Sequence, residues 1–152
     1  MAVTALLGAG VLTGGSTALA AKHRPAKRTG SEPSTVSKST NPCTYVPIGK
    51  AKTILHGKVK ETEAPLGPTC IFTIKGSKQT ATLAIEVVNV TSTVHKMKHV
   101  SKFKVTGHQG YCGTLGTATV LVKLRHHQVL DVHAPCAAAK ALAAVAVRRI
   151  RT

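Results

Sequence analysis

Four segments of the chain carry hydrophobic and polar residues in the alternation typical of β-strands. The clearest is 80–90, whose apolar face consists of Ala81, Leu83, Ile85 and Val87. Residues 70–74 precede it across a short Gly- and Ser-containing turn, so the two segments predict a hairpin. Residues 117–124 and 129–133 alternate in the same way on either side of a turn. We therefore expect two hairpins.

Three segments carry apolar residues at helical spacing. Residues 44–56 predict a short helix with Pro47 near its first turn. Residues 91–99 are ambiguous between helix and loop. Their apolar spacing, continued to position 100, favours a short amphipathic helix that ends before Val105. The most regular helix follows Pro135, and its apolar stripe consists of Ala139, Leu142, Ala143, Ala146, Val147 and Ile150.

Glycine recurs at every third position from 107 to 116. This is the period of collagen, but four repeats without proline are far too few for a triple helix. We interpret the segment as a turn-rich loop around Cys112. All the elements together predict an α+β domain. It would have a small antiparallel sheet of about four strands in two hairpins, with an N-terminal and a C-terminal helix, and it would be cross-linked by disulfides.

The first twenty residues predict an export signal. The segment contains no charged side chain and ends in Ala-Leu-Ala, so we expect cleavage after Ala20. Basic residues follow at once, and positive charge directly after an apolar run opposes translocation. The alternative is an uncleaved anchor, for which a segment rich in Gly, Ala and Thr is poorly suited. No cysteine precedes Cys43, so we expect no lipid anchor.

The chain then divides into a linker and a domain. Residues 21–41 are rich in Ser, Thr, Pro and basic side chains, and they contain too few aliphatic residues to fold. We predict a basic linker there and a single domain over residues 42–152. The whole chain holds 21 Lys and Arg against 5 Asp and Glu, a formal net charge of +16. This positive charge is spread over the domain and is not confined to the linker.

The four cysteines favour disulfides over a metal site. None lies in a Cys-x-x-Cys pair, so the usual structural zinc motif is missing. Four cysteines in an exported chain indicate two bridges with three possible connectivities. We favour Cys43–Cys70 and Cys112–Cys136, because each pair would tie the start of a helix to a neighbouring strand or loop. A reactive thiol pair is the alternative.

Several short motifs follow one another in a characteristic order. They are Asn-Pro-Cys-Thr at 41–44, Gly-Pro-Thr-Cys-Ile-Phe at 67–72, Val-Thr-Gly at 105–107, and an Ala-rich helix at 139–147. This order resembles a family of small exported actinobacterial lipoproteins and secreted domains with no assigned function. The resemblance covers residues 42–150 and implies the compartment and the fold. It implies no catalytic residues, and the lipid-bearing cysteine of the lipoproteins is absent here.

Signals for catalysis or metal binding are weak. His95 and His99 would share one face of a helix, and the pair at 126–127 has His133 nearby, but no third ligand is indicated. Asp131 and His133 lie on one strand face without a Ser or Cys partner. We expect no enzymatic activity, no bound metal and no cofactor.

The positive charge is the strongest functional signal. A strongly basic surface attracts polyanions through counterion release. The predicted binding residues are Lys22, Arg24, Lys27 and Arg28 in the linker, and Lys96, Lys98, Lys102 and Lys104 in the domain. Smaller basic groups occur at 50–52, 58–60 and 148–151. Few aromatic residues accompany this charge, so sequence-specific recognition of nucleic acid is not expected.

Three hypotheses about function remain open. The first is a secreted or envelope-associated monomer that binds anionic cell-wall polymers or lipid head groups. The second is an envelope metal-binding or thiol-redox protein, which requires bound metal or titratable thiols. The third is a structural partner of another envelope protein, which requires no affinity for generic polyanions. Charge that only keeps the protein soluble is the simplest alternative to all three.

Overall fold

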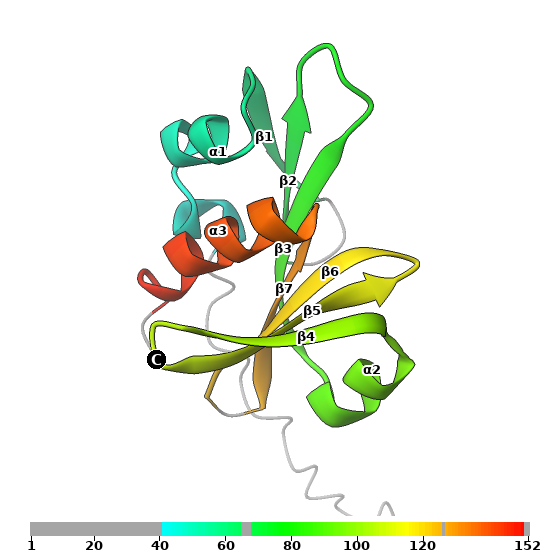
Figure 1. Ribbon diagram of the computed structural model, residues 1–152. Coiled ribbons are helices and arrows are strands. Elements are labelled where there is room, and N and C mark those ends of the chain that lie inside the picture. Colours follow the sequence, from blue (N-terminus) through cyan, green and yellow to red (C-terminus); the bar gives the residue numbers. More distant parts are fainter. Residues whose placement is uncertain (1–40, 65–67, 126, 151–152) are drawn as a thin grey trace, which may run out of the picture. The chain divides into compact units, whose positions relative to one another are not determined.

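A computed structural model describes residues 41–64, 68–125 and 127–150 (Figure 1). The predicted signal peptide (residues 1–20) and the predicted linker up to residue 40 lie outside the described residues. The same is true of the predicted binding residues Lys22, Arg24, Lys27 and Arg28.

The described chain forms one seven-stranded antiparallel sheet and a small set of helices. The strands are β1 (Val59–Glu63), β2 (Thr69–Ile74), β3 (Thr80–Val87), β4 (Lys98–Val105), β5 (His108–Leu115), β6 (Thr117–Lys123) and β7 (Gln128–His133). The helices are a 3-10 helix, η1 (Pro42–Tyr45), and the α-helices α1 (Ile48–Ile54), α2 (Val90–Lys96) and α3 (Cys136–Val147). The strand order is β1-β2-β3-β7-β6-β5-β4. Two meanders therefore meet where β3 pairs with β7.

The prediction of a small sheet of about four strands was wrong. The two predicted hairpins are present as β2–β3 and β6–β7. The sheet also contains β1, β4 and β5, which the alternation of residues did not indicate. Strand β1 has one buried residue, Val59, because it lies at the edge of the sheet, and its other positions are exposed. An edge strand with so little burial has almost no hydrophobic pattern to detect.

The helix predicted over residues 91–99, ending before Val105, is present only in its first part. Helix α2 ends at Lys96, and β4 begins at Lys98 on the opposite edge of the sheet. The register of β4 against β5 shifts between Lys98 and Ser101, and His99 adopts a positive φ of 53° there. His95 and His99 therefore lie on different elements and do not share a helix face. The helix predicted at 44–56 is likewise divided into η1 and α1 by extended backbone.

The glycine-rich segment forms strand β5 and its two turns, not a loop. Gly107 and Gly116 have φ values of +82° and +73° in the turns, a conformation that glycine adopts at little cost. A Cβ on Gly110 would lie 2.5 Å from the Phe103 ring, which covers this position from β4. A Cβ on Gly113 would lie 2.8 Å from a backbone carbonyl oxygen at the β4 irregularity. The regular spacing thus arises from two turns and two close approaches.

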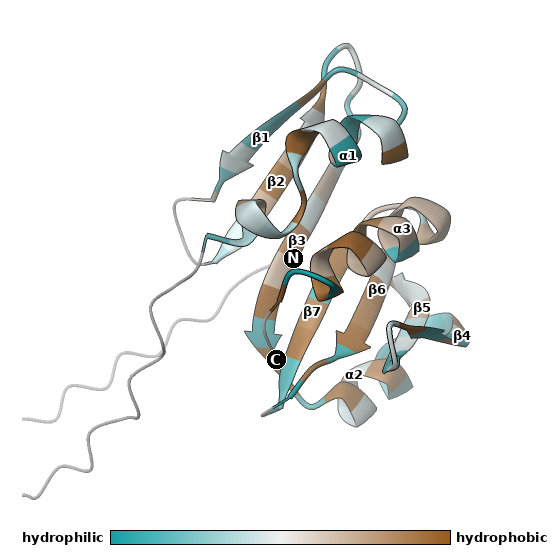
Figure 2. Ribbon diagram, turned by 90° about the vertical axis from the view of Figure 1, so that its left-hand side faces the viewer, coloured by the Kyte–Doolittle hydropathy of each residue, from teal (hydrophilic) through white to brown (hydrophobic). Residues whose placement is uncertain are grey.

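The two faces of the sheet are covered differently. Helices η1, α1 and α3 lie on one face and enclose the main core, where the apolar α3 lies over β6 and β7 (Figure 2). Its fully buried side chains include Phe72, Leu83, Leu130 and Leu142. On the other face, Val90 and Met97 in and next to α2 form a smaller cluster with Leu121 and Val129.

Both disulfides are present in the predicted pairing. Cys43–Cys70 joins η1 to β2 with a Cα–Cα distance of 5.0 Å. Cys112–Cys136 joins β5 to the first residue of α3 with a Cα–Cα distance of 6.1 Å. Both distances lie in the normal range for a disulfide, and no cysteine is free. Two such bridges indicate an oxidising, extracytoplasmic environment.

Candidate anion-binding surface

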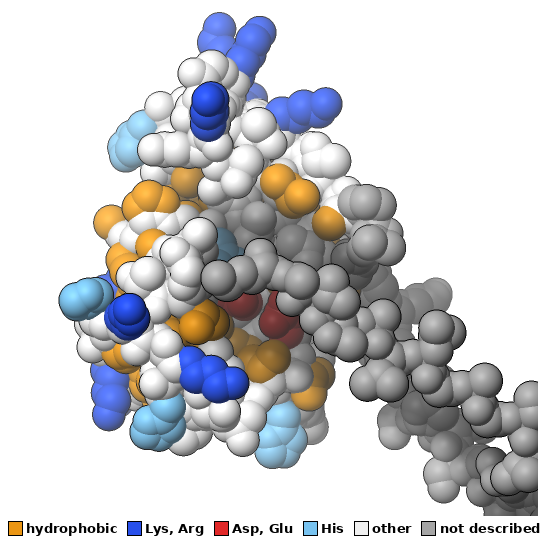
Figure 3. Space-filling model, turned by 90° about the vertical axis from the view of Figure 1, so that its right-hand side faces the viewer, with side chains coloured by type: hydrophobic (Ala, Val, Ile, Leu, Met, Phe, Trp, Pro, Cys, Tyr) orange, Lys and Arg blue, Asp and Glu red, His pale blue; other side chains and the backbone are white. Residues whose placement is uncertain are grey.

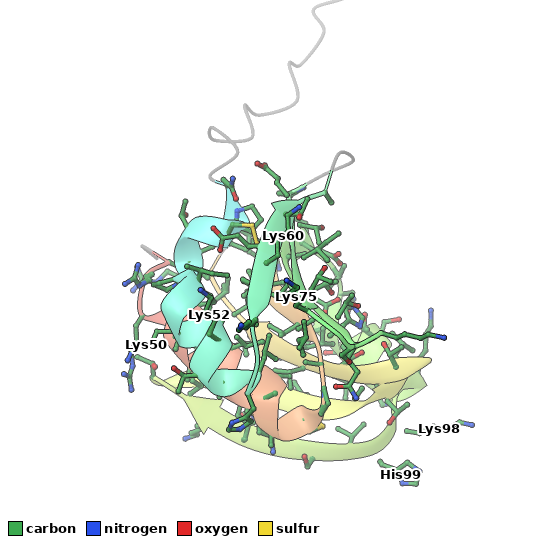
Figure 4. All side chains as sticks on the ribbon, turned by 90° about the horizontal axis from the view of Figure 1, so that it is seen from above. Lys50, Lys52, Lys60, Lys75, Lys98 and His99 are labelled. Atoms are coloured by element: carbon green, nitrogen blue, oxygen red, sulfur yellow. A yellow bond between two sulfur atoms is a disulfide. The ribbon has the colours of Figure 1, made fainter. Side chains whose placement is uncertain are left out.

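Lysine side chains gather at one end of the sheet from three segments of the chain. We call this group the lysine end; it comprises Lys50 and Lys52 of α1, Lys58 and Lys60 at the start of β1, and Lys75 and Lys78 in the β2–β3 turn. All six are exposed. The backbone N–H of Lys75 donates to the carbonyl oxygen of Lys58 at 2.8 Å, so these two positions are direct neighbours. Figure 4 shows Lys52, Lys60 and Lys75 together on this side, with Lys98 and His99 at the far edge of the view.

Local structure explains why these lysines project into solvent. In α1 the residue between Lys50 and Lys52, Ala51, is fully buried against the core, which leaves its two neighbours on the outside. Lys75 and Lys78 lie in a turn that reverses at Gly76, whose φ of +81° is favourable for glycine. On β1, Lys60 alternates with the buried Val59 and points away from the core.

No lysine of this group is paired with a described carboxylate. Within the described residues the single ion pair is the one between His133 and Asp131. Of the two glutamates of β1, Glu61 directly follows Lys60 without forming an ion pair with it, and Glu63 accepts a hydrogen bond from the side-chain amide of Asn41 at 2.7 Å. The six lysines of the lysine end therefore form no salt bridge with a described carboxylate.

The predicted domain residues Lys96, Lys98, Lys102 and Lys104 are exposed but do not form one helical surface. Lys96 ends α2, and Lys98 lies on the other side of the β4 irregularity from the last two. Lys102 and Lys104, two residues apart in β4, share a face of the sheet, where Lys102 is opposite Tyr111. The structure thus brings together two of these four residues and separates the others.

A polar cluster on the α2 side of the sheet was only partly anticipated. His133 Nε2 lies 3.2 Å from Asp131 Oδ2, and its Nδ1 lies 3.1 Å from the hydroxyl oxygens of both Thr117 and Thr119. Pairing of β3 with β7 brings Glu86 to the same face. The sequence placed Asp131 and His133 together and paired their strand with the strand of the two threonines, but it did not indicate the pairing of β3 with β7 that brings Glu86 to the cluster. In Figure 3 the acidic side chains lie recessed near the centre of the view.

The geometry of this cluster explains its electrostatics. The hydrogen bond to Asp131 raises the pKa of His133 above its ordinary value. Burial, reinforced by the nearby Asp131 carboxylate, raises the pKa of Glu86. The buried Thr119 hydroxyl donates to the carbonyl oxygen of Thr117 at 3.1 Å, so the backbone of β6 holds it in place. Among the described residues no three His, Cys, Asp or Glu side chains are arranged to hold a metal ion.

These shifts predict that the protein loses stability as pH rises. His133 contributes fully below pH 6.5, and its contribution is lost as pH rises through its higher folded-state pKa. The His133 side chain is 39% exposed, so solvent limits the loss to about 0.2–1 kcal/mol. Urea denaturation of wild type and His133→Gln across this range measures it, as the difference between the two free energies of unfolding.

Glu86 provides an internal check on this assignment. Because its folded-state pKa is also raised, ionisation of Glu86 lowers stability in an earlier window that begins at pH 4.5. Glu86→Gln should remove the earlier loss and keep the later one. A difference between wild type and His133→Gln that does not change above pH 6.5 would contradict the role of the Asp131–His133 pair.

Comparison with known proteins gives this chain no relatives: no family model, curated protein or solved structure matches it. No helix in the described part of the chain is both long enough and apolar enough to span a membrane. The fold and the site define a basic, disulfide-bonded domain with one antiparallel sheet. Its resemblance to exported actinobacterial proteins stays a prediction.

Proposed function

We propose that this protein is exported and acts at the cell envelope as a non-catalytic binding protein for anionic components. The lysine end is the surface that makes this contact. The observation that carries the proposal is the convergence of six exposed lysines from three segments, none paired with a described carboxylate. The two disulfides support an extracytoplasmic location, because such bridges persist in oxidising compartments.

The chemistry of the surface favours charge attraction over shape recognition. All six side chains are lysines, which carry compact charges on flexible stems and lack the planar fork with which arginine binds a phosphate bidentately. A flexible array of this kind fits a repeating anion such as a wall polymer or a layer of lipid head groups. The absence of aromatic residues from the group argues against stacking on nucleic-acid bases.

Binding to anionic vesicles provides the test. The variant Lys52→Gln/Lys60→Gln/Lys75→Gln removes three charges from the lysine end. Each lysine near an anionic bilayer contributes about 1 kcal/mol, so we expect roughly 100-fold weaker binding to vesicles that contain phosphatidylglycerol. Sedimentation of the protein with vesicles at low salt measures the affinity, and a rise in salt should weaken the wild type steeply.

A matched control separates a local surface from net charge. The variant Lys98→Gln/Lys102→Gln/Lys104→Gln removes the same charge from β4, away from the lysine end. It should bind vesicles much more tightly than the lysine-end variant. Equal losses in the two variants would show that net charge alone attracts the protein. A wild type that does not bind anionic vesicles at low salt would refute the proposed function.

A further inference from the structure

An apolar groove opens beside the lysine end. It has a volume of about 530 Å³ and lies between the C-terminal end of α1, the first half of α3 and the ends of β2 and β3. Its apolar lining includes Ile54, Leu55, Ile74, Ala81, Ala138 and Ala141. This volume is typical of pockets that bind small molecules.

The sequence of α3 explains why the groove is open. The residues that α3 presents to it are alanines, whose side chains end at Cβ and cannot fill the space toward α1. Larger apolar side chains of α3, such as Leu142 and Val147, point instead into the core and are buried. The groove is therefore open because the residues on this face of α3 are small.

The lysines adjoin the groove through the residues that line it. Lys50 lies one helical turn before the lining residue Ile54. Lys75 directly follows Ile74, and Lys78 directly precedes Gln79 at the mouth of the groove. An apolar wall and a cluster of positive charges thus share one edge.

Lysines lie nearer to this edge than the carboxylates of β1. Val59 of β1 is opposite Ile74 in the groove, Glu61 is opposite Phe72, and Glu63 is opposite Cys70 at the other end of the strand. In extended strand, Glu61 lies about 7 Å and Glu63 about 13 Å from Val59. Lys58 and Lys75 directly adjoin Val59 and Ile74, so an anionic group at the mouth of the groove would meet these lysines before Glu61.

We propose that this groove holds the acyl chain of a single-chain anionic phospholipid whose head group lies on the lysine end. The inference rests on the proposed function and specifies its ligand. The apolar lining contacts the hydrocarbon chain, and removal of its methylene groups from water favours binding. The lysines bind the phosphate as point charges. Charge complementarity selects this occupant over an uncharged lipid.

Titration with lysophosphatidylglycerol below its critical micelle concentration tests the proposal. Calorimetry, or the NMR chemical shifts of α3 amides, measures the binding. Affinity should rise about fourfold for each added methylene until the groove is full. Lysophosphatidylcholine of the same chain length should bind more weakly because its head group has no net charge. Lys50→Gln/Lys75→Gln should weaken binding of the anionic lipid about 30-fold and leave binding of the zwitterionic lipid nearly unchanged.

Filling the groove provides the decisive variant. Ala141→Leu places a larger side chain in the cavity and should weaken lysophosphatidylglycerol at least tenfold while leaving vesicle binding by the lysine end intact. Ala144→Leu is the matched control, because Ala144 lies one turn further along α3 and does not line the groove. Ala141→Val serves as a milder second variant if Ala141→Leu unfolds.

The outcomes distinguish this inference from the function on which it rests. Vesicle binding by the lysine end without any effect of chain length or of Ala141→Leu would overturn the groove proposal and leave the proposed function standing. Loss of binding to both vesicles and single-chain lipid in the wild type would overturn both. Equal affinity for the anionic and zwitterionic lipids would show a purely apolar pocket and would also overturn the proposal.

Discussion

Replacement of Cys112 and Cys136 by alanine together is expected to lower the free energy of unfolding by about 2–5 kcal/mol. The bridge closes a loop with a sequence separation of 24, for which the loss of chain entropy in the unfolded state accounts for about 3 kcal/mol. Alanine at the fully buried position 112 also leaves a small void beside the core. Urea denaturation of the oxidised protein and of the double variant measures the difference.

The other bridge supplies the comparison. Cys43→Ala/Cys70→Ala opens a loop of similar length, with a separation of 27, so we expect a loss of similar size. Reduction of the wild type should cost more than either double variant because it opens both loops. A loss below about 1 kcal/mol for Cys112→Ala/Cys136→Ala would show that the bridge has no substantial part in stability.

The two bridges hold opposite sides of the sheet. In the order β1-β2-β3-β7-β6-β5-β4, strands β2 and β5 are each second from an edge. Cys70 attaches η1 to β2, and Cys112 attaches α3 to β5. The helical layer is therefore fastened to the sheet on both sides of the central β3–β7 pair. This arrangement suits a small core that has few large side chains.

Most of the elements that could be predicted from the sequence have a regular apolar face. The alternation of β3 and the stripe of α3 are regular because one side of each packs into the core. Strand β6 was also predicted from alternation, although the structure buries it on both faces from Thr119 to Val122. The favoured disulfide pairing is confirmed as well, because each bridge ties the start of a helix to a neighbouring segment, although Cys112 lies in strand β5 and not in a loop.

The elements that were missed are those whose environment depends on distant partners. Strands β1 and β4 are edges with few buried positions, so β1 has almost no alternation and β4 alternates only over residues 102–105. Strand β5 is rich in glycine because Phe103 and the backbone of the β4 irregularity leave no room for a side chain at Gly110 and Gly113. No local pattern reports such a contact.

The candidate site was missed for a related reason. The lysine pairs at 50–52 and 58–60 are visible in the sequence, but their proximity to Lys75 depends on the β1–β2 pairing. Because β1 was not predicted, nothing in the sequence joined these groups into one surface. Conversely, the helical spacing that grouped Lys96 with Lys104 disappeared when β4 proved to be a strand. The groove depends on the packing of α1 beside α3, which is also a long-range feature.

Phe72→Ala is expected to be the most damaging single core substitution, with a loss of about 3–5 kcal/mol in the free energy of unfolding. Phe72 heads the largest fully buried side chains of the described residues and is 0% exposed. It lies in β2 opposite Ala81, a small residue that leaves room for the ring. A loss of this size is a large part of the stability of an ordinary domain. Urea denaturation measures it, and Phe72→Leu provides a milder variant that keeps most of the apolar volume.

The chain contains a second phenylalanine in a contrasting position. Phe103 lies on the edge strand β4, is half-buried, and has the Lys140 ammonium 5.0 Å from the centre of its ring. Phe103→Ala should therefore cost clearly less than Phe72→Ala, because it removes less buried surface and Lys140 can return to water. If the two substitutions cost the same, the main stabilising core would not be centred on β2 and β3, and Phe103 would have to be counted among its essential members.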